Sequence, residues 1–277
     1  MNNKPIGVFD SGVGGLTAVR ELKKLLPDEN IVYFGDTGRN PYGTRSKNTI
    51  IKYAKQAVRF LMKHDVKAVI AACGTVSTVL DEKAALDILG KDMPYTGIVL
   101  PATRTACAMS AGGRIGVIAT TAAIRSGAYG RAVRAISPSA KVFGNACPLL
   151  VPLVENGMIG VDNKISRLVL EMYLRPLMKE EIDTLILGCT HFPLLYDLIN
   201  DVLGYDVTLI DPCVSAVAEL KTGLTKQGML NESADGGGRV NYFLTDSPEN
   251  FESVVALFLR GEANGKITHI DIESIDA

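Results

Sequence analysis

The chain has 277 residues, of which 47% are hydrophobic and 6% aromatic, and its formal net charge is −1. This length suits two domains of about 100 to 150 residues each. The balanced charge and the lack of a long basic run argue against nucleic acid as a partner. No apolar stretch of about 20 residues is present to span a membrane, and no signal-peptide pattern follows Met1. The five cysteines fit no disulfide framework or zinc-binding spacing, so we expect a protein of the reducing cytoplasm.

Short apolar segments with strand character alternate along the chain with longer helical patterns. The strand-like segments are Ile6–Phe9, Ile31–Phe34, Ala68–Ala72, Gly97–Leu100, Ile115–Ile118, Lys141–Phe143, Thr184–Leu187 and Thr208–Ile210. The helical patterns between them include Thr17–Leu26, Thr49–Lys63, Lys164–Met178 and Phe192–Val202. Strands that alternate with helices of this length indicate βαβ units and largely parallel sheets. The sequence therefore predicts an α/β fold.

Two prolines mark the expected boundaries between two lobes. Strand character stops at Leu100-Pro101, and a second crossing is expected at Ile210-Asp211-Pro212. After a further helical pattern, the glycine-rich turn Ala234-Asp235-Gly236-Gly237-Gly238 leads into the strand-like segment Val240–Leu244. We interpret this tail as completing the first lobe. The result is a discontinuous lobe of residues 1–99 plus 210–277 and an inserted lobe of residues 100–209.

A glycine-rich turn, Asp10-Ser11-Gly12-Val13-Gly14-Gly15, follows the first expected strand. Its glycines allow a ligand to approach the backbone and leave N–H groups free for an anion. It is not the dinucleotide-binding G-x-G-x-x-G motif, because Thr17 stands where the last glycine belongs. A tight turn capped by Asp10 explains the pattern equally well. Asp10 is of interest because it and Cys73 should end neighbouring strands at one edge of the sheet, where ligands bind.

Cys73 and Cys189 each follow a buried strand and precede a helical pattern. At such a position, the N–H groups of a helix N-terminus favour thiolate over thiol. Most cysteines are small apolar fillers, and we interpret Cys107, Cys147 and Cys213 in that way. The repeated context of Cys73 and Cys189 favours two opposed proton-transfer groups instead.

A weak internal repeat supports this interpretation. Ile6-Gly7-Val8-Phe9-Asp10-Ser11 precedes Cys73 by about the same stretch of chain as Ile115-Gly116-Val117-Ile118-Ala119-Thr120 precedes Cys189. The order of elements is the same in both halves. We therefore expect two related α/β lobes that present their thiols from opposite sides.

Three further groups are weaker candidates. In the long turn after the second strand, Tyr42 and Gly43 offer backbone donors to a carboxylate and Arg39 a positive charge, although Pro-Tyr-Gly is common turn chemistry. His191 lies two residues from Cys189, where it could deprotonate or orient that thiol or serve only a structural role. Glu155 is a minor candidate at an expected helix end.

Taken together, these segments resemble the glutamate racemases of the cofactor-independent aspartate/glutamate racemase superfamily. The similarity runs from position 7 to about 212. It rests most on Asp10-Ser11-Gly12-Val13-Gly14-Gly15 and Gly188-Cys189-Thr190-His191-Phe192-Pro193-Leu194, with support from Gly35-Asp36-Thr37, Pro41-Tyr42-Gly43, Cys73-Gly74-Thr75-Val76-Ser77, Ser126-Gly127-Ala128-Tyr129 and the segment Cys147–Glu155.

The resemblance implies two pseudo-symmetric lobes, each a largely parallel sheet flanked by helices, with the active site in the cleft between them. It implies interconversion of L- and D-glutamate for peptidoglycan synthesis, without a cofactor or metal. Its catalytic residues correspond to Cys73, Cys189, Asp10 and His191, and its substrate contacts to Asp10, Ser11, Pro41, Tyr42, Gly43, Gly74, Thr75 and Thr190. The expected partner is a small amino-acid substrate, with neither nucleic acid nor membrane, and a homodimer is left open.

The chain departs from the family pattern beside the first thiol. Gly74 stands where the family usually has Asn, and Val76 where it usually has Ala. A lost hydrogen bond to a charged group costs about 1.5–3 kcal/mol, so the departure bears on substrate affinity. The bulkier Val76 suggests that neighbouring side chains have refilled the space.

Three alternatives stay open from the sequence. A racemase of the same superfamily acting on aspartate or another amino acid would share the thiols. A ligand-binding relative would keep the scaffold with an impaired site. A thiol redox protein is the least favoured, because the chain lacks a C-x-x-C motif.

Overall fold

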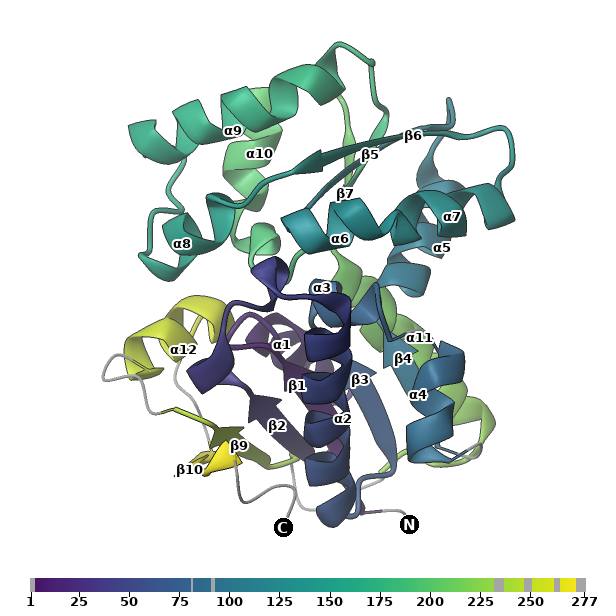
Figure 1. The fold of residues 1–277 in the computed structure, drawn as a ribbon, viewed down its shortest axis with the longest axis vertical. Coiled ribbons are helices and arrows are strands. Elements are labelled where there is room, and N and C mark those ends of the chain that lie inside the picture. The colour runs from purple at the N-terminus through teal and green to yellow at the C-terminus, as the bar shows by residue number, and fades with distance from the viewer. Residues whose placement is uncertain are drawn as a thin grey trace.

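Two parallel β-sheets form the frame of the molecule in this computed structural model, which describes residues 3–80, 82–90, 93–231, 237–246, 251–261 and 265–272 (Figure 1). The first sheet has the strand order β10-β9-β2-β1-β3-β4 and the second β6-β5-β7-β8. The first comprises β1 (Ile6–Asp10), β2 (Ile31–Gly35), β3 (Ala68–Ala71), β4 (Tyr95–Gly97), β9 (Val240–Leu244) and β10 (Gly265–His269). The second comprises β5 (Arg114–Ala119), β6 (Lys141–Ala146), β7 (Thr184–Leu187) and β8 (Thr208–Ile210). Every pairing is parallel.

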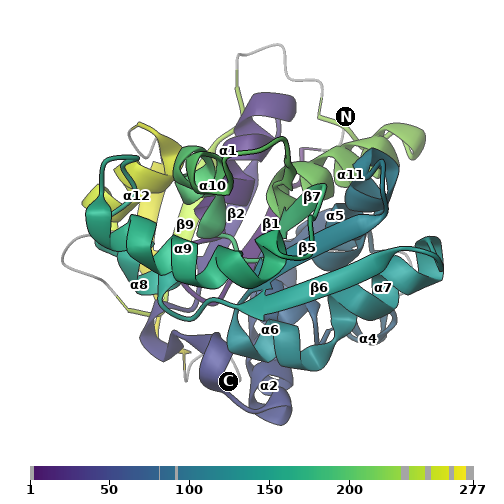
Figure 2. The same cartoon turned by 90° about the horizontal axis from the view of Figure 1, so that it is seen from above.

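Helices cover both faces of each sheet, as parallel sheets require. On the first sheet, α1 (Leu16–Leu25), α11 (Pro212–Lys226) and α12 (Phe251–Leu259) pack together on one face, and α2 (Lys47–Lys63) and α4 (Glu82–Leu89) on the other (Figure 1). On the second sheet, α8 (Leu150–Glu155), α9 (Lys164–Met178) and α10 (Tyr196–Leu203) lie opposite α5 (Val99–Met109), α6 (Thr121–Ser126) and α7 (Ala128–Ile136) (Figure 2). Short connections contain α3 (Gly74–Ser77) and the 3-10 helices η1 (Thr37–Arg39), η2 (Tyr42–Thr44) and η3 (Phe192–Leu195).

Local sequence signals fix where several helices begin. The Ser46 side chain accepts a hydrogen bond from the Thr49 N–H at the start of α2, and the Asn163 side chain accepts one from the Ser166 N–H at the start of α9. Asp211 caps α11 through the N–H groups of residues 213 and 214, with Pro212 at the first helical position. The capped helices then bury their apolar faces, which supplies most of their stability.

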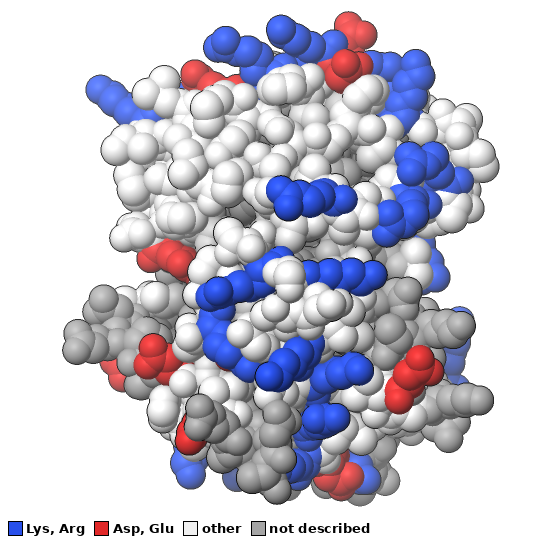
Figure 3. All heavy atoms as spheres, in the orientation of Figure 1, with Lys and Arg blue, Asp and Glu red and all other residues white. Residues whose placement is uncertain are grey.

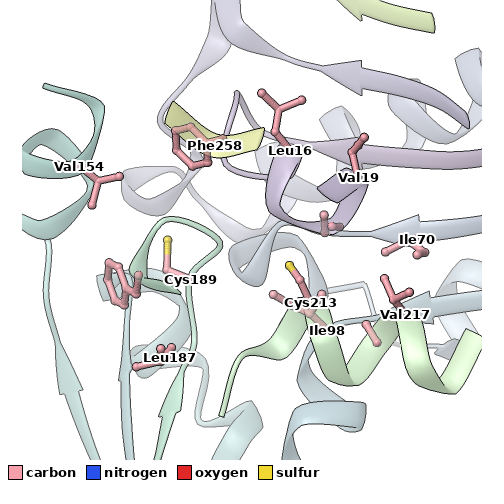
Figure 4. Packing of buried hydrophobic residues seen from close by; sticks show 14 of the residues in the cluster. Leu16, Val19, Ile70, Ile98, Val154, Leu187, Cys189, Cys213, Val217 and Phe258 are labelled. Carbon is pink, nitrogen blue, oxygen red and sulfur yellow. The ribbon is translucent and has the colours of Figure 1, made fainter. Parts of the chain in front are cut away.

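One hydrophobic cluster runs from the first sheet into the second. It joins Leu16 and Ile70 of the first sheet's layers to Leu187 and Cys189 at the end of β7 (Figure 4). Cys213 of α11 lies in the same cluster. The edges of the two sheets that carry the strand ends therefore face one another across packed side chains.

The predicted α/β class with two largely parallel sheets is confirmed, and most strands match their predicted bounds within two residues. The strand predicted over Gly97–Leu100 is wrong, because β4 ends at Gly97 and α5 starts at Val99. The helix predicted over Phe192–Val202 divides into η3 and α10. Of the predicted turn 234–238, residues 234–236 lie outside the described part of the chain.

The lobe boundaries after residues 99 and 209 stay a proposal. Two observations support it. Strand β9 lies between β10 and β2, so the tail of the chain belongs to the first sheet. The second sheet consists of β5 to β8, and the described strands of the tail, β9 and β10, pair in the first sheet. No helix in the described ranges has the length and hydropathy to cross a bilayer.

Candidate active site

A cavity of about 250 Å³ lies between the two lobes, at the ends of β1, β3, β5 and β7. It brings together all but one of the predicted site residues: Ser11, Pro41, Tyr42, Gly43, Cys73, Gly74, Thr75, Cys189, Thr190 and His191. The exception is Asp10, which is buried at the end of β1 with 2% of its surface exposed. Ligand-sized cavities at strand ends are the usual binding sites of α/β proteins.

Cys73 is the residue that precedes α3, and its side chain is 5% exposed. Its thiol donates to Ser11 Oγ at 3.3 Å. Burial and the charge of Asp10 raise the pKa of the Cys73 thiol to about 12, although the hydrogen bond with Ser11 and the one from the Val76 N–H oppose the rise. Burial and the nearby carboxylate therefore oppose the stabilisation of a Cys73 thiolate that we expected from the helix N-terminus.

Asp10 lies close enough to Cys73 for the two groups to interact electrostatically. Its Oδ1 accepts the Gly12 N–H at 2.9 Å, and hydrogen bonds from the Gly12 and Gly15 backbones lower the pKa of this buried carboxyl. Burial raises the pKa of the Asp10 carboxyl, and the charge of His191 lowers it. Burial of a carboxylate is costly, so Asp10 accepts a proton more readily than an exposed carboxylate does.

Cys189 forms a chain of contacts with His191 and Glu155 in the second lobe. Cys189 Sγ lies 3.7 Å from His191 Nδ1, and His191 Nε2 lies 3.0 Å from Glu155 Oε1. Burial lowers the pKa of His191, but its hydrogen bonds to Cys189 and Glu155 outweigh burial and raise that pKa to about 10. The imidazole is therefore protonated at neutral pH and holds its charge beside the second sulfur.

The second thiol does not precede an α-helix. Residues 188–191 form a turn, and η3 follows before α10 starts. Cys73 thus lies directly before α3, whereas Thr190 and His191 separate Cys189 from the 3-10 helix that leads into α10. The group that lies beside the Cys189 sulfur is the His191 imidazole.

An aromatic ring from the end of the chain supports His191. The Phe258 ring of α12 meets the imidazole edge-on, with the ring centroids 5.3 Å apart. Phe258 is fully buried and lies beside Cys189 and Val154 in the shared cluster (Figure 4). The first lobe therefore positions a group of the second.

Asp36 anchors the loop that carries Tyr42 and Gly43. This fully buried carboxylate accepts hydrogen bonds from the Tyr42 hydroxyl, from Arg39 Nε at 2.7 Å and from Thr245 Oγ1 at 2.8 Å. The Arg39 guanidinium also stacks on Tyr53 at 3.8 Å. Arg39 is thus engaged with Asp36 and does not line the cavity, contrary to the suggestion that it offers a charge to a ligand.

Several residues that line the cavity were not among the predicted site residues. They are Asn40, Thr44, Thr120, Thr121, Pro148, Val151 and Pro152, while Glu155 was only a minor candidate. The internal repeat held a signal for Thr120, because it places this residue at the position of Ser11. Thr120 Oγ1 lies 2.9 Å from Thr75 Oγ1 and so connects the two lobes across the cavity.

The other cysteines lie away from the cavity wall that the structure describes. All five cysteines are free, and Cys147 and Cys213 are buried. The described residues contain no group of three or more His, Cys, Asp or Glu side chains arranged to hold a metal ion.

Residues 16–220 match the family model for Asp/Glu/Hydantoin racemase. The chain belongs to this racemase family. It is 43% identical to a glutamate racemase of Neisseria meningitidis serogroup A over 92% of this chain and 93% of that protein. A glutamate racemase of Geobacter metallireducens is 40% identical over 98% of both chains. The crystal structure of glutamate racemase from Francisella tularensis in complex with D-glutamate has a TM-score of 0.90 and 37% identity, covering 99% of this chain and 100% of that one.

Proposed function

We propose that this racemase interconverts L- and D-glutamate by proton transfer through Cys73 and Cys189. One observation carries the proposal. The two lobes place one thiol each on the wall of a single small cavity, and each thiol has its own assisting group. Racemisation requires one group to remove the α-proton and another to deliver a proton to the opposite face. Two thiols from opposing lobes meet that requirement.

The assisting groups differ in kind. Asp10 stands behind Cys73, whereas protonated His191, held by Glu155, stands beside Cys189. In one direction the Cys189 sulfur takes the α-proton and the Cys73 thiol donates its own. In the other direction the roles reverse, and the buried Asp10 carboxylate, which interacts electrostatically with Cys73, assists release of the Cys73 proton. Proton transfer by positioned groups typically contributes about 10²- to 10⁴-fold in rate.

Neutral donors bind the carboxylates of the substrate in this proposal. The cavity wall contains no Lys or Arg among the residues that the structure describes. It does contain the hydroxyls of Ser11, Thr75, Thr121 and Thr190, together with backbone N–H groups in the segments around Gly43 and Gly74. Such donors, fixed in a cavity with little water, stabilise negative charge more strongly than they do in bulk solvent.

The cellular role follows from the same chemistry. We assign the D-glutamate product to peptidoglycan synthesis, as the family resemblance implies. We place the enzyme in the cytoplasm, because both of its reacting sulfurs must stay reduced and all five cysteines are free.

Turnover of pure L-glutamate, followed by polarimetry or circular dichroism, tests the proposal. We expect racemisation in both directions, unchanged after dialysis against a chelator and without added pyridoxal phosphate. L-aspartate and other amino acids form the comparison panel. Faster turnover of another amino acid would contradict the substrate assignment, and no turnover of any would contradict the reaction.

We also propose that two copies associate through the exposed face of α9. Ile165, Leu168 and Met172 follow one side of this helix with 57%, 66% and 54% of their surface exposed. In Figure 3 the surface between α9 and α8 carries few charged side chains, whereas charged side chains lie along the upper edge, where Figure 1 draws α9. An antiparallel two-fold contact would pair Ile165 with the partner's Met172 and place Arg175 opposite the partner's Asp162.

Leu168→Glu should convert the dimer to a monomer in light scattering. Met109→Glu, which changes an equally exposed apolar residue on α5, is the control and should leave the dimer intact. A monomeric wild-type protein, or equal effects of both substitutions, would contradict this interface.

A further inference from the structure

The two thiol-bearing segments meet at a glycine. A Cβ atom on Gly74 would lie 2.5 Å from the backbone oxygen of Gly188, the residue that precedes Cys189. Carbon and oxygen atoms do not approach so closely without strain, and here the opposing atom belongs to the backbone. The first lobe therefore touches the second at this point only because position 74 has no side chain.

Two other glycines of the first lobe meet the second lobe in the same way. A Cβ on Gly14 would collide with the side chains of Thr190 and His191, and one on Gly43 would lie 3.1 Å from Thr120 Cβ. Gly14, Gly43 and Gly74 come from three separate segments that surround the cavity.

The Gly188 turn has no room to retreat from a side chain at position 74. The Gly188 N–H donates to the Ile118 oxygen at 2.7 Å. A Cβ on Gly188 would lie 3.0 Å from Ala119 Cβ and 3.0 Å from the hydroxyl of Tyr129, which is 3% exposed. A local shift of the turn would therefore disturb β5 and the buried Tyr129, so the cheaper response is separation of the lobes.

We propose that Gly74 is a positioning residue: by admitting the Gly188 carbonyl, it sets how closely the two lobes close and thereby the spacing of Cys73 and Cys189. The proposal rests on the two-thiol function above. Cys73 precedes Gly74 and Cys189 follows Gly188, so the contact lies directly between the two sulfur-bearing residues. Both cysteines are nearly inaccessible in this arrangement, at 5% and 6% exposed.

Gly74→Ala tests the proposal by inserting the smallest possible side chain, a single methyl group, between the lobes. Gly223 of α11 provides the matched control, because a Cβ there meets nothing within 4 Å. The first readout is the rate at which iodoacetamide alkylates each cysteine, followed by peptide mass spectrometry, with the half-buried Cys107 as internal reference. We expect at least a tenfold faster reaction at Cys73 and Cys189 in Gly74→Ala, and no change in Gly223→Ala.

The second readout separates positioning from binding. The added methyl group changes the spacing of the two thiols. We therefore expect kcat to decrease by a larger factor than KM increases, in both directions of the reaction. Adding Tyr129→Phe to Gly74→Ala removes the hydroxyl behind Gly188 and should restore part of the alkylation protection. Wild-type alkylation rates and kcat in a folded Gly74→Ala variant would overturn the proposal.

A milder variant keeps the test decisive if Gly74→Ala does not fold. Gly43→Ala meets a side chain rather than backbone, and we expect a smaller increase in alkylation of the same two cysteines. Unchanged protection in that variant would also overturn the proposal. The alkylation readout needs no turnover, so a wild-type enzyme that fails to racemise glutamate would refute the proposed substrate without deciding the role of Gly74.

Discussion

At the scale of single residues, the two sulfurs of the site are unlike. Burial and Asp10 keep the Cys73 thiol protonated, with its pKa raised to about 12. Cys189 faces an imidazolium that Glu155 holds in place. A pseudo-symmetric fold thus carries an asymmetric pair of proton-transfer groups. This asymmetry suits a substrate whose two enantiomers present the α-proton to different lobes.

Removing either sulfur should abolish racemisation while the protein stays folded. We expect Cys73→Ala and Cys189→Ala each to lower kcat by about 10³-fold or more, at a cost in stability of about 1 kcal/mol because the sulfurs are buried. Cys107→Ala is the control. Near wild-type turnover in a folded variant of either cysteine would refute the two-thiol mechanism.

The His191–Glu155 pair should make the stability of the enzyme depend on pH. Hydrogen bonds to Cys189 and Glu155 overcome burial and raise the pKa of His191 from 6.5 to about 10. Because the folded pKa lies above the unfolded one, the stabilisation is complete below pH 6.5 and disappears as the pH rises through about 10. Glu155→Gln removes one cause of the rise. Its free energy of unfolding in urea should therefore fall less steeply across this range than that of the wild type, and parallel profiles would contradict the assignment.

At the scale of elements, the sequence predicted the strands better than the connections. β1, β2, β3, β5 and β7 are apolar runs buried on both faces, which leave a clear signal. Gly97–Leu100 misled the prediction because its apolar residues continue from β4 into α5. β10 was missed because its five residues are mostly exposed, so no apolar pattern marks it.

The contact of α12 with the site gives a prediction for that helix. Phe258→Ala should destabilise the protein by about 3–5 kcal/mol, as loss of a buried aromatic ring does, and should lower kcat because His191 loses the ring that holds it. Phe258→Leu fills most of the volume and serves as the control for packing. We would measure chemical denaturation together with steady-state rates. A variant as active as the wild type at temperatures where it is fully folded would show that α12 supports the fold alone.

At the scale of the whole molecule, the site is a product of two lobes brought together. The motifs beside each strand end could be recognised from the sequence, since each is local. The pairing of Thr75 with Thr120, of His191 with Glu155 and of His191 with Phe258 could not, because each joins segments distant in the chain. The suggestion that Val76 or a neighbouring side chain fills the space beside Gly74 left the identity of the neighbour open. The three atoms nearest to a Cβ there belong to Gly188 and Ile98, and none to Val76.

Gly74→Asn distinguishes a local effect on the substrate contact from an effect on the contact between the two lobes. If only the local contact mattered, the new amide would donate to a substrate carboxylate and lower KM by the factor expected for one charged hydrogen bond, worth about 1.5–3 kcal/mol. In this structure the contact between the lobes opposes that result, because the Cβ atom of any side chain at position 74 would meet the Gly188 carbonyl oxygen. The amide would then hold the cavity open and admit water to the thiols. We therefore expect KM for both enantiomers to rise and kcat to fall, measured by steady-state kinetics in both directions. A clear decrease in KM would contradict this expectation, because it would show that the protein accommodates a side chain at position 74 without opening the cavity.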